Sequence, residues 1–367
     1  MKTATVLFAV CLGLLVGPAT AADYRVETLA EGLEHPWSIV FLPDGTRLVT
    51  ERPGRLRVID RDGRLQQAPV HGLPDDIHTG GQAGLMDLAL APDFAGSRQV
   101  FLTYACGTHS RNHLCLGRGR FEGGRLAGFE ELFRTRPGKK GNVHYGGRLA
   151  FLPDDTLLLT TGDGFDYREQ AQNTANHLGA VLRLNQEGAA PGDNPFVDDP
   201  DAADAIYSYG HRNPQGIVRD PETGRVYINE HGPRGGDEIN ILEPGANYGW
   251  PVVTRGVDYT GALVTPFTQK AGMVDAILNW TPSIAPSGLT LYDGDLFPHW
   301  QGDLFSGALA ARKVQRVRLE GGEVVGQDSL LEGPGRRIRD VRTAPDGALV
   351  LLTDHADGEI LRLVPAD

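Results

Sequence analysis

The amino-acid sequence predicts an all-β protein, and more specifically a six-bladed β-propeller built of four-stranded antiparallel blades. Three observations carry this prediction. The chain of 367 residues contains 48 Gly and 24 Pro, a composition that suits many tight turns. Helical periodicity is scarce, and only residues 169–178 have the pattern of a short helical turn. The third observation is an apolar hairpin pattern that recurs six times along the chain.

In each copy of this pattern an apolar run is followed by a Pro-Asp or Asp-Gly turn and a second apolar run. Pro fixes φ, Asp caps the turn and Gly accepts positive φ, so these pairs indicate β-hairpins. The segments between copies, such as 55–63 and 117–126, are long enough for the two further strands of a propeller blade. A β-sandwich or a β-helix is the alternative, although a sandwich is expected to have shorter, more uniform spacing. The six copies span residues 39–51, 88–104, 149–163, 217–230, 289–309 and 341–354.

Residues 1–22 have the features of a secretory signal peptide, with Lys2 at a positive start and an apolar stretch at 4–16. A buried first helix is the alternative, but the chain turns polar at Asp23. No later apolar run reaches membrane-spanning length. We therefore expect a periplasmic or secreted protein without stable membrane insertion, in which residues 23–367 form a single propeller domain.

Export leaves two cysteines, Cys106 and Cys115, which flank what the sequence predicts to be a loop between two strand-like runs. In an oxidising compartment a local disulfide is the expected outcome. Metal ligation by the two thiols is the weaker alternative.

Polar turns lie at the ends of the strand-like runs between residues 208 and 251. The first is GHRNPQG, in which Arg212 supplies a fixed fork of donors and Asn213 supplies both a donor and an acceptor. These groups suit a ligand with carboxylates. For an isolated Arg-Asn-Pro, however, a structural turn is the simpler interpretation.

The second turn is EHGPRGGDEIN. Gly232 and Pro233 can present two adjacent backbone carbonyls, and Asp237 and Glu238 add carboxylates. Carbonyl and carboxylate oxygens are the ligands that Ca²⁺ prefers. The alternative is an acidic, solvated turn.

His144 lies just before one strand-like run, and Asp163 lies at the end of its hairpin partner. A carboxylate beside an imidazole fixes its tautomer and raises its basicity, which is typical of a general base. A lone histidine is otherwise more often structural. Gln82 lies in the glycine-rich turn GGQAG at another strand entrance, and this turn is not a phosphate loop because no lysine follows and no helix begins.

Arg337 and Arg339 lie on one face of a strand-like run near the C-terminus. Taken alone, this pair is better explained by a salt-bridged exposed strand. The formal net charge of the chain is −12, which makes it a poor binder of nucleic acid and makes a local cation cluster more informative.

Together, GHRNPQG, the EHGP…DEIN block, NYGWP, APSGL and RIRD resemble, in this order, the soluble sugar dehydrogenases that depend on pyrroloquinoline quinone (PQQ). The resemblance is greatest to the bacterial aldose sugar dehydrogenases, relatives of soluble quinoprotein glucose dehydrogenase and of sorbosone dehydrogenase. It runs over nearly the whole mature chain, from GLEHPWSIVFLPDG to RIRDVRTAPDGALVLLTD. It implies a six-bladed propeller that uses PQQ and Ca²⁺ and oxidises the C1 hydroxyl of an aldose to a lactone.

The resemblance also implies a role for each candidate residue. His144 matches the general base that assists hydride transfer to PQQ, Asp163 the carboxylate that orients it, and Arg212 a catalytic contact to the reactive quinone. The other implied roles are a sugar contact at Gln82, cofactor contacts at Arg212, Asn213, Asp237, Ser283, Arg337 and Arg339, Ca²⁺ ligation by the carbonyls of Gly232 and Pro233, and a second Ca²⁺ site with Glu238 and the carbonyl of Tyr248.

The resemblance extends to partners. It implies an aldose substrate and an external electron acceptor, which is a quinone, a dye or a redox protein. The chain lacks the loop insertions of the dimeric glucose-specific members, so we expect a monomer. Ala310 and Ala311 occupy a turn where some relatives have a lysine that contacts PQQ, which would weaken or rearrange PQQ binding. A Ca²⁺-dependent lactonase and a non-catalytic ligand-binding propeller are the alternative functions.

Overall fold

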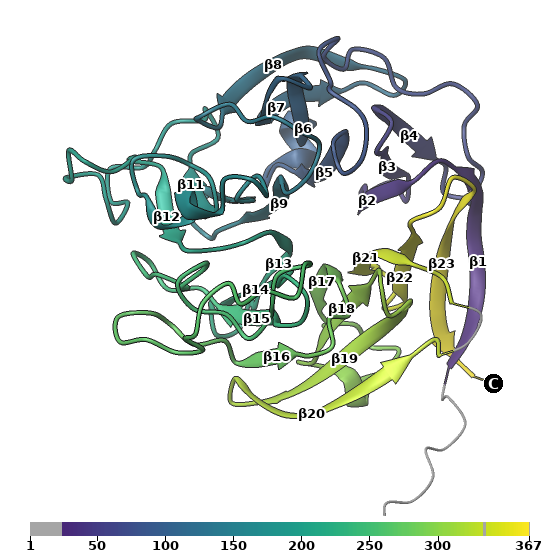
Figure 1. Cartoon of the computed structure of the whole chain (residues 1–367). Helices are drawn as coiled ribbons and strands as arrows, with labels where there is room; N and C mark the ends of the chain where they lie inside the picture. Colours follow the sequence, from purple (N-terminus) through teal and green to yellow (C-terminus); the bar gives the residue numbers. More distant parts are fainter. Residues whose placement is uncertain (1–23, 333–334, 367) are drawn as a thin grey trace, which may run out of the picture.

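The computed structural model describes residues 24–332 and 335–366, so the predicted signal peptide lies outside the described residues. Six antiparallel sheets are arranged in a ring (Figure 1). The predicted all-β, six-bladed propeller is therefore confirmed. The six hairpins predicted from the sequence form the first two strands of the six blades.

Each blade begins with its innermost strand. The first two blades contain β2 (Pro36–Phe41), β3 (Arg47–Glu51) and β4 (Arg55–Ile59), then β5 (Leu85–Leu90), β6 (Gln99–Thr108), β7 (Arg111–Phe121) and β8 (Leu126–Arg134). The next two contain β9 (Gly146–Phe151), β10 (Leu157–Thr161), β11 (Ala180–Leu184) and β12 (Ile206–Tyr209), then β13 (Pro214–Arg219), β14 (Val226–Glu230), β15 (Asp237–Ile241) and β16 (Leu278–Trp280). The last two contain β17 (Pro286–Leu291), β18 (Leu304–Ala308), β19 (Lys313–Glu320) and β20 (Glu323–Leu330), then β21 (Ile338–Thr343), β22 (Leu349–Thr353) and β23 (Gly358–Pro365).

The ring is closed by the N-terminal strand β1 (Tyr24–Leu33). It pairs antiparallel with β23 and forms the outermost strand of the last blade, where the two ends of the described chain lie side by side (Figure 1). The first and last segments of the domain are thus joined by backbone hydrogen bonds. This ladder covers the outer edge of β23 and joins the two ends of the ring.

The first blade has three regular strands, and an irregular segment takes the fourth position. The N–H of Gln66 donates to the Val58 carbonyl at 2.9 Å, and that of Val70 donates to the Leu56 carbonyl at 2.8 Å. The two donors are four residues apart and their acceptors only two, so the ladder is irregular in the stretch that contains Pro69.

Helices are short in the described part of the chain: α1 (Phe94–Ser97) and the 3₁₀ turns η1 (Arg168–Gln172) and η2 (Pro298–Trp300). None of them could span a membrane. The helical turn predicted over 169–178 is thus shorter than expected. The Asn176 side chain donates to the carbonyls of Gln170 and Asn173, at 3.2 and 2.7 Å, and takes acceptors that a longer helix would need.

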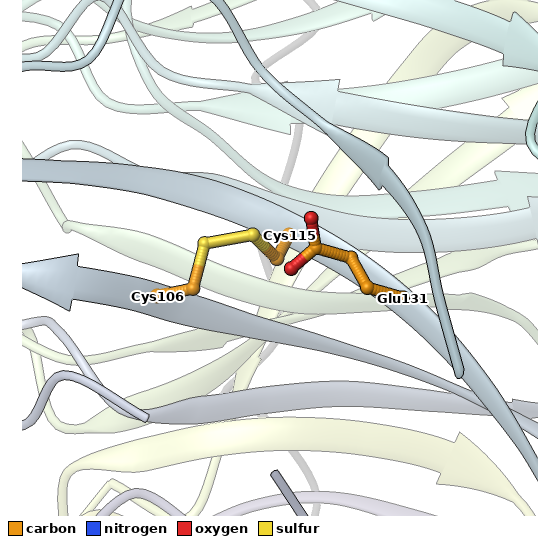
Figure 2. A group of neighbouring side chains, drawn as sticks. All are labelled: Cys106, Cys115 and Glu131. Carbon is orange, nitrogen blue, oxygen red and sulfur yellow. A yellow bond between two sulfur atoms is a disulfide. The ribbon is translucent and has the colours of Figure 1, made fainter. Parts of the chain in front are cut away.

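Cys106 and Cys115 form a disulfide between β6 and β7, with Cα atoms 6.0 Å apart (Figure 2). The prediction of a loop between them was wrong, because residues 99–121 form a hairpin with only a tight turn at its tip. Cys106 is opposite His113 and Cys115 is opposite Tyr104, so the bond runs diagonally across the two strands. Glu131 lies beside the sulfurs, but oxidised cysteines offer no thiolate to a metal.

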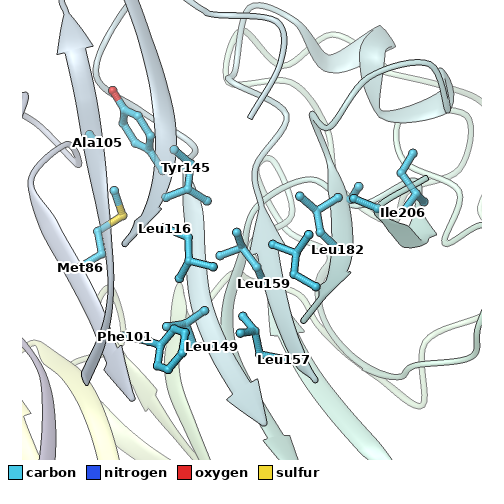
Figure 3. Packing of buried hydrophobic residues seen from close by; sticks show 14 of the residues in the cluster. Met86, Phe101, Ala105, Leu116, Tyr145, Leu149, Leu157, Leu159, Leu182 and Ile206 are labelled. Atoms are coloured by element: carbon cyan, nitrogen blue, oxygen red, sulfur yellow. The ribbon is translucent and has the colours of Figure 1, made fainter. Parts of the chain in front are cut away.

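A hydrophobic cluster fills each interface between neighbouring blades, so the core consists of six layers around the ring. Strand β10 shows the arrangement. Leu157 and Leu159 pack towards the blade of β5–β8, beside Phe101 and Leu149 (Figure 3), whereas Leu158 packs towards the blade of β13–β16. Strand side chains alternate between faces, and both faces are buried here. The strand sequence is therefore continuously apolar.

The innermost strands carry a buried cluster of opposite charges. Arg148 of β9 lies 2.8 Å from Asp340 of β21 and 3.5 Å from Asp87 of β5. Arg342 reaches the same two carboxylates, at 3.0 and 3.2 Å. Arg148 also donates to the carbonyl of Arg339 at 3.1 Å, which ties this cluster to the rim described next.

Candidate functional site

Polar side chains from different blades gather at one rim of the ring. In a propeller, the residues before each innermost strand and after each second strand lie at the same end of the blades. His144, Asn213 and Arg337 come directly before or within two residues of β9, β13 and β21. Asp163 and Asp354 follow β10 and β22. The repeat therefore brings together residues that are far apart in the sequence.

A cavity of about 170 Å³ lies at this rim. The predicted residues Gln82, Arg337 and Arg339 line it. A larger cavity, about 510 Å³, lies among the turns of β2–β3, β5–β6 and β21–β22, but its lining is mostly apolar and contains none of the predicted site residues. We therefore place the candidate site at the smaller cavity. Its remaining lining is Trp37, Arg52, Met86, Tyr145, Gly146, Gln215, His231, Ala285 and Leu309.

His144 and Asp163 form a buried pair beside this cavity. The Nδ1 atom of His144 lies 2.7 Å from Asp163 Oδ1. Asp163 also accepts from the backbone N–H of Phe165 at 2.7 Å and from the indole N–H of Trp250 at 2.8 Å. The backbone N–H of His144 donates to Gln82 Oε1 at 2.8 Å. His144 has φ of 55°, an uncommon left-handed conformation for a residue with a side chain, and these contacts hold it there.

The surroundings keep this pair in a form suited to accept a proton. Burial lowers the pKa of His144; the bond to Asp163 opposes this, while the positive charges of Arg212 and Lys139 lower the pKa further. Burial would raise the pKa of Asp163, but the bond to His144 and the charge of Arg212 outweigh it, so that pKa is lowered. A neutral imidazole beside a carboxylate is the state of a general base.

Arg212 and Asn213 lie against the cavity wall. Asn213 Oδ1 accepts from the N–H of Gly146 at 3.1 Å, and Arg212 donates from Nη1 to the His231 carbonyl at 3.2 Å. Arg212 Nε and Asn213 Nδ2 are buried donors with no partner among the described residues, and so is Arg339 Nε. An unpaired buried donor is costly, so these groups suit a ligand rich in acceptors.

Arg337 and Arg339 are held by one carboxylate, that of Asp354. Both guanidinium groups reach Asp354 Oδ2, at 3.1 and 3.0 Å, while His35 Nδ1 lies 2.9 Å from Oδ1. Burial would raise the pKa of Asp354, but Arg339, His35 and Arg52 reverse the effect and the pKa is strongly lowered. One carboxylate thus faces several cations, and the rim keeps an excess of positive charge.

The turn that contains Gly232 and Pro233 is built around Asp237. Asp237 accepts from the N–H of Gly232 at 2.9 Å, from Ser283 Oγ at 3.0 Å and from the N–H of Ala285 at 2.8 Å. Asp237 and Ser283 are therefore engaged with each other and with the turn. The Gly232 carbonyl accepts from Arg212 Nη1 at 2.6 Å, which leaves its second lone pair for another ligand.

Glu238 of β15 and Glu230 of β14 are acidic neighbours paired across the two strands; Glu230 is buried and Glu238 is half-buried. Burial raises the pKa of Glu238 to about 8, and the charge of Glu230 raises it too. Asn240 donates to both carboxylates, at 3.3 and 3.4 Å, while its Oδ1 atom is buried without a partner among the described residues. Oxygen atoms gathered in this way suit a cation. Tyr248 lies nearby, stacked on His211, which bonds Glu230.

Several residues of this rim were not identified from the sequence. Trp37, Arg52 and His231 line the cavity, Asp354 holds the arginines, and Trp250 holds Asp163. Their common feature is position, because most of them lie at the beginning of an innermost strand or just after a second strand. Once one knows which end of the blades forms the site, the position of a residue in the hairpin repeat therefore identifies it as a residue of this rim.

The fold and the site define a six-bladed propeller in which a histidine–aspartate pair adjoins a cavity lined by arginines. The family model described as Glucose / Sorbosone dehydrogenase matches residues 33–362, and the chain belongs to this family. The aldose sugar dehydrogenase YliI of Escherichia coli is 40% identical over 364 residues, which cover 97% of this chain and 96% of the relative.

Solved structures agree with this assignment. The crystal structure of the soluble aldose sugar dehydrogenase from Escherichia coli in the apo form is 40% identical, with a TM-score of 0.90 over 94% of this chain and 100% of that one. The PQQ-bound aldose sugar dehydrogenase from Streptomyces coelicolor is 30% identical, with a TM-score of 0.75 over 94% of this chain and 99% of that one.

Proposed function

We propose that this protein is a PQQ-dependent dehydrogenase that oxidises the C1 hydroxyl of aldose sugars to lactones. The observation that carries the proposal is the buried His144–Asp163 pair beside a cavity that three arginines line, one of which, Arg339, has an unpaired Nε. The family and the PQQ-bound relative support the same chemistry.

In this proposal His144 takes the proton from the sugar. Asp163 is ionised and can only accept, so Nδ1 of His144 carries the hydrogen that joins them. The lone pair of the neutral imidazole is then on Nε2, where it can receive the proton of a hydroxyl. Gln82, which lines the cavity and fixes the His144 backbone, is the proposed sugar contact.

PQQ, when bound, supplies an ortho-quinone, which accepts a hydride, and carries three carboxylates; a Ca²⁺ ion beside it supplies a Lewis acid. Arg337 and Arg339 would hold the carboxylates, because guanidinium groups bind carboxylates in a bidentate manner. Arg212 and Asn213 would contact the quinone. The unpaired Nε of Arg339 and Nδ2 of Asn213 support these roles.

The carbonyls of Gly232 and Pro233 would hold the Ca²⁺ ion of the cofactor. Asp237 supports this role by fixing the Gly232 N–H, and Ser283 supports it by fixing Asp237. We propose a second Ca²⁺ site at Glu238 and the carbonyl of Tyr248. Its support is the gathering of oxygens around Glu238, a half-buried carboxylate that forms no ion pair among the described residues.

We also propose that the enzyme is exported, is a monomer, and passes its electrons to an external acceptor. The Cys106–Cys115 disulfide supports an oxidising compartment, because disulfides persist outside the cytosol.

Reconstitution tests the proposal. Purified protein should oxidise glucose or xylose with a dye as acceptor once PQQ and Ca²⁺ are added, and should lose this activity on chelation. His144→Ala should lose most turnover and keep PQQ binding. Absence of both PQQ binding and oxidation across a panel of aldoses would refute the proposal. Lactone hydrolysis that needs Ca²⁺ but not PQQ would identify a lactonase, and ligand binding unaffected by His144→Ala would identify a binding propeller.

A further inference from the structure

A buried lysine lies behind the His144–Asp163 pair. Lys139 is only 3% exposed. Its backbone N–H and carbonyl each pair with those of Asn112 at 2.8 Å, which fixes its position beside β7. Its side chain lies along the backbone of Gly164, the residue after Asp163, so closely that a Cβ atom at Gly164 would meet Lys139 Cδ at 2.8 Å.

The ammonium group of Lys139 has no acidic partner in contact with it. Nζ lies 3.6 Å from the centroid of the Tyr145 ring and 3.5 Å from the Gly141 carbonyl. No carboxylate of the described residues forms an ion pair with it. A cation–π contact compensates part of the lost hydration. A buried cation held this way beside a histidine–carboxylate pair points to a role for its charge.

Lys139 and His144 line the same small cavity, of about 10 Å³, together with Tyr145. A cavity of this volume is at the lower limit for a single water molecule. Protein rather than bulk solvent therefore separates the lysine from the imidazole. The electrostatic interaction between them is screened less than it would be in water. His113, another titratable side chain of this cavity, is engaged with the Thr135 carbonyl at 2.7 Å.

The charged groups around Lys139 determine when it carries its charge. Burial lowers the pKa of Lys139 to about 7, while Asp163 and Asp166 oppose this shift. The charge of Lys139 in turn lowers the pKa of His144, in addition to burial and to the charge of Arg212.

We propose that Lys139 is a positioning residue for the His144–Asp163 pair: its ammonium favours the carboxylate of Asp163 and opposes a second positive charge on the adjacent imidazole. Lys139 is charged in acid, where protonation would otherwise remove the base. Lys139 loses its proton as the pH rises, in the range where His144 is neutral without the help of a neighbouring charge. The role in turnover rests on the function proposed above, whereas the effect on the protonation of His144 does not.

The test is a titration of His144 in the full mature chain, with and without PQQ and Ca²⁺. Histidine labelled with ¹³C is followed by NMR from about pH 5 to about pH 9, the range in which imidazoles titrate, and His144→Gln assigns the signal. Lys139→Met keeps the length of the side chain and removes the charge. Lys140→Met is the matched control, because the neighbouring Lys140 is exposed and loses the same charge at the surface.

We expect Lys139→Met to shift the His144 titration to higher pH and Lys140→Met to leave it unchanged. In dye-linked sugar oxidation, the acid limb of kcat/KM should shift in the same direction. Lys139→Gln provides a second neutral variant if the Met variant does not fold, and Lys139→Arg should restore the wild-type titration. A purely structural role would lower the melting temperature without shifting either curve.

Coincident His144 titrations in the wild type and the folded neutral variants would overturn the proposal. A shifted titration in a protein that oxidises no aldose would support the role of Lys139 and refute the proposed function. Aldose oxidation with unshifted His144 titrations would support the proposed function and refute the role of Lys139.

Discussion

Asp163→Asn is the substitution that tests the site most directly. Asp163 accepts three hydrogen bonds, from His144 Nδ1 and the Phe165 N–H at Oδ1, both at 2.7 Å, and from Trp250 Nε1 at Oδ2, at 2.8 Å. Asparagine offers one oxygen and one NH₂ group in place of two oxygens. If the NH₂ group takes the place of Oδ2, it faces the indole N–H of Trp250. If it takes the place of Oδ1, it faces the N–H of Phe165.

In either orientation at least one buried donor loses its acceptor, which costs about 1–3 kcal/mol of folding free energy. The carboxylate charge that stabilises an imidazolium is lost in both. If the NH₂ faces His144, the ring must accept at Nδ1 and carry its proton on Nε2, so that it cannot act as a base. We therefore expect turnover to fall by about 10²- to 10⁴-fold, the usual contribution of general-base catalysis.

The assay combines urea unfolding with dye-linked sugar oxidation, and Asp198→Asn is the control because Asp198 is an exposed carboxylate in another segment. The pKa of Asp163 is lowered in the folded state. Its stabilising contribution is therefore present above the unfolded pKa of about 4 and is lost as the pH falls through the folded value. The stability gap between wild type and Asp163→Asn should narrow in acid. Equal stability and equal turnover at neutral pH would refute this account of the pair.

Three further predictions concern stability. Arg148→Met leaves the buried Asp87 and Asp340 with one cation instead of two, and should cost about 3–5 kcal/mol of unfolding free energy in chemical denaturation. Arg64→Met at an exposed pair should cost about 0–1 kcal/mol, and similar losses in the two variants would contradict a stabilising role for the buried charge cluster of the innermost strands. Burial, assisted by Arg136, lowers the pKa of His177 to about 4, so stability should fall as the pH drops from about 6.5 to about 4, and His177→Gln should make the melting temperature less dependent on pH over this window. Ca²⁺ should raise the melting temperature of the protein without PQQ, and Glu238→Gln should reduce the increase; a wild type insensitive to Ca²⁺ would refute the second ion site.

The fold was predictable because its signals are local. Each innermost hairpin is marked by turn residues between two apolar runs, and these signals do not depend on distant contacts. The outer segment of the first blade departs from the pattern, because its donors and acceptors are out of step around Pro69. The loop predicted between Cys106 and Cys115 was wrong because a hairpin with a two-residue turn has no Pro or Asp-Gly mark there.

The candidate site was predictable in part. His144 and Asp163 belong to one hairpin, so their approach follows from the blade itself. The contact of Asp354 with two arginines and His35 requires the closed ring, because His35 comes from the first blade and Asp354 from the last. The burial of Lys139 was not predictable, because Lys139 and Lys140 together have the sequence pattern of a surface pair. Only the packing of Lys139 against Gly164 distinguishes it from its exposed neighbour.

The site consists of two units that respond to change in different ways. Arg337 and Arg339 both contact Asp354, and Arg339 also donates to Gln215 Oε1 at 3.2 Å; both arginines lie far from the turn at Gly232 in the chain. Among the described residues Arg337 donates to Asp354 and to the Leu309 carbonyl alone, so replacing it should weaken anion binding and leave the His144–Asp163 pair intact.

Arg212 belongs to the other unit and cannot be replaced so selectively. Its Nη1 atom holds the Gly232 carbonyl at 2.6 Å, and its guanidinium carbon lies 5.2 Å from the ring centroid of Trp250, whose indole donates to Asp163. Its charge, after the larger effect of burial, lowers the pKa of His144. The strength of the base and the geometry of the proposed ion-binding turn therefore depend on the same side chain. A protein that loses Arg212 loses both together, because one cation stabilises the carboxylate, the neutral imidazole and the carbonyl at once.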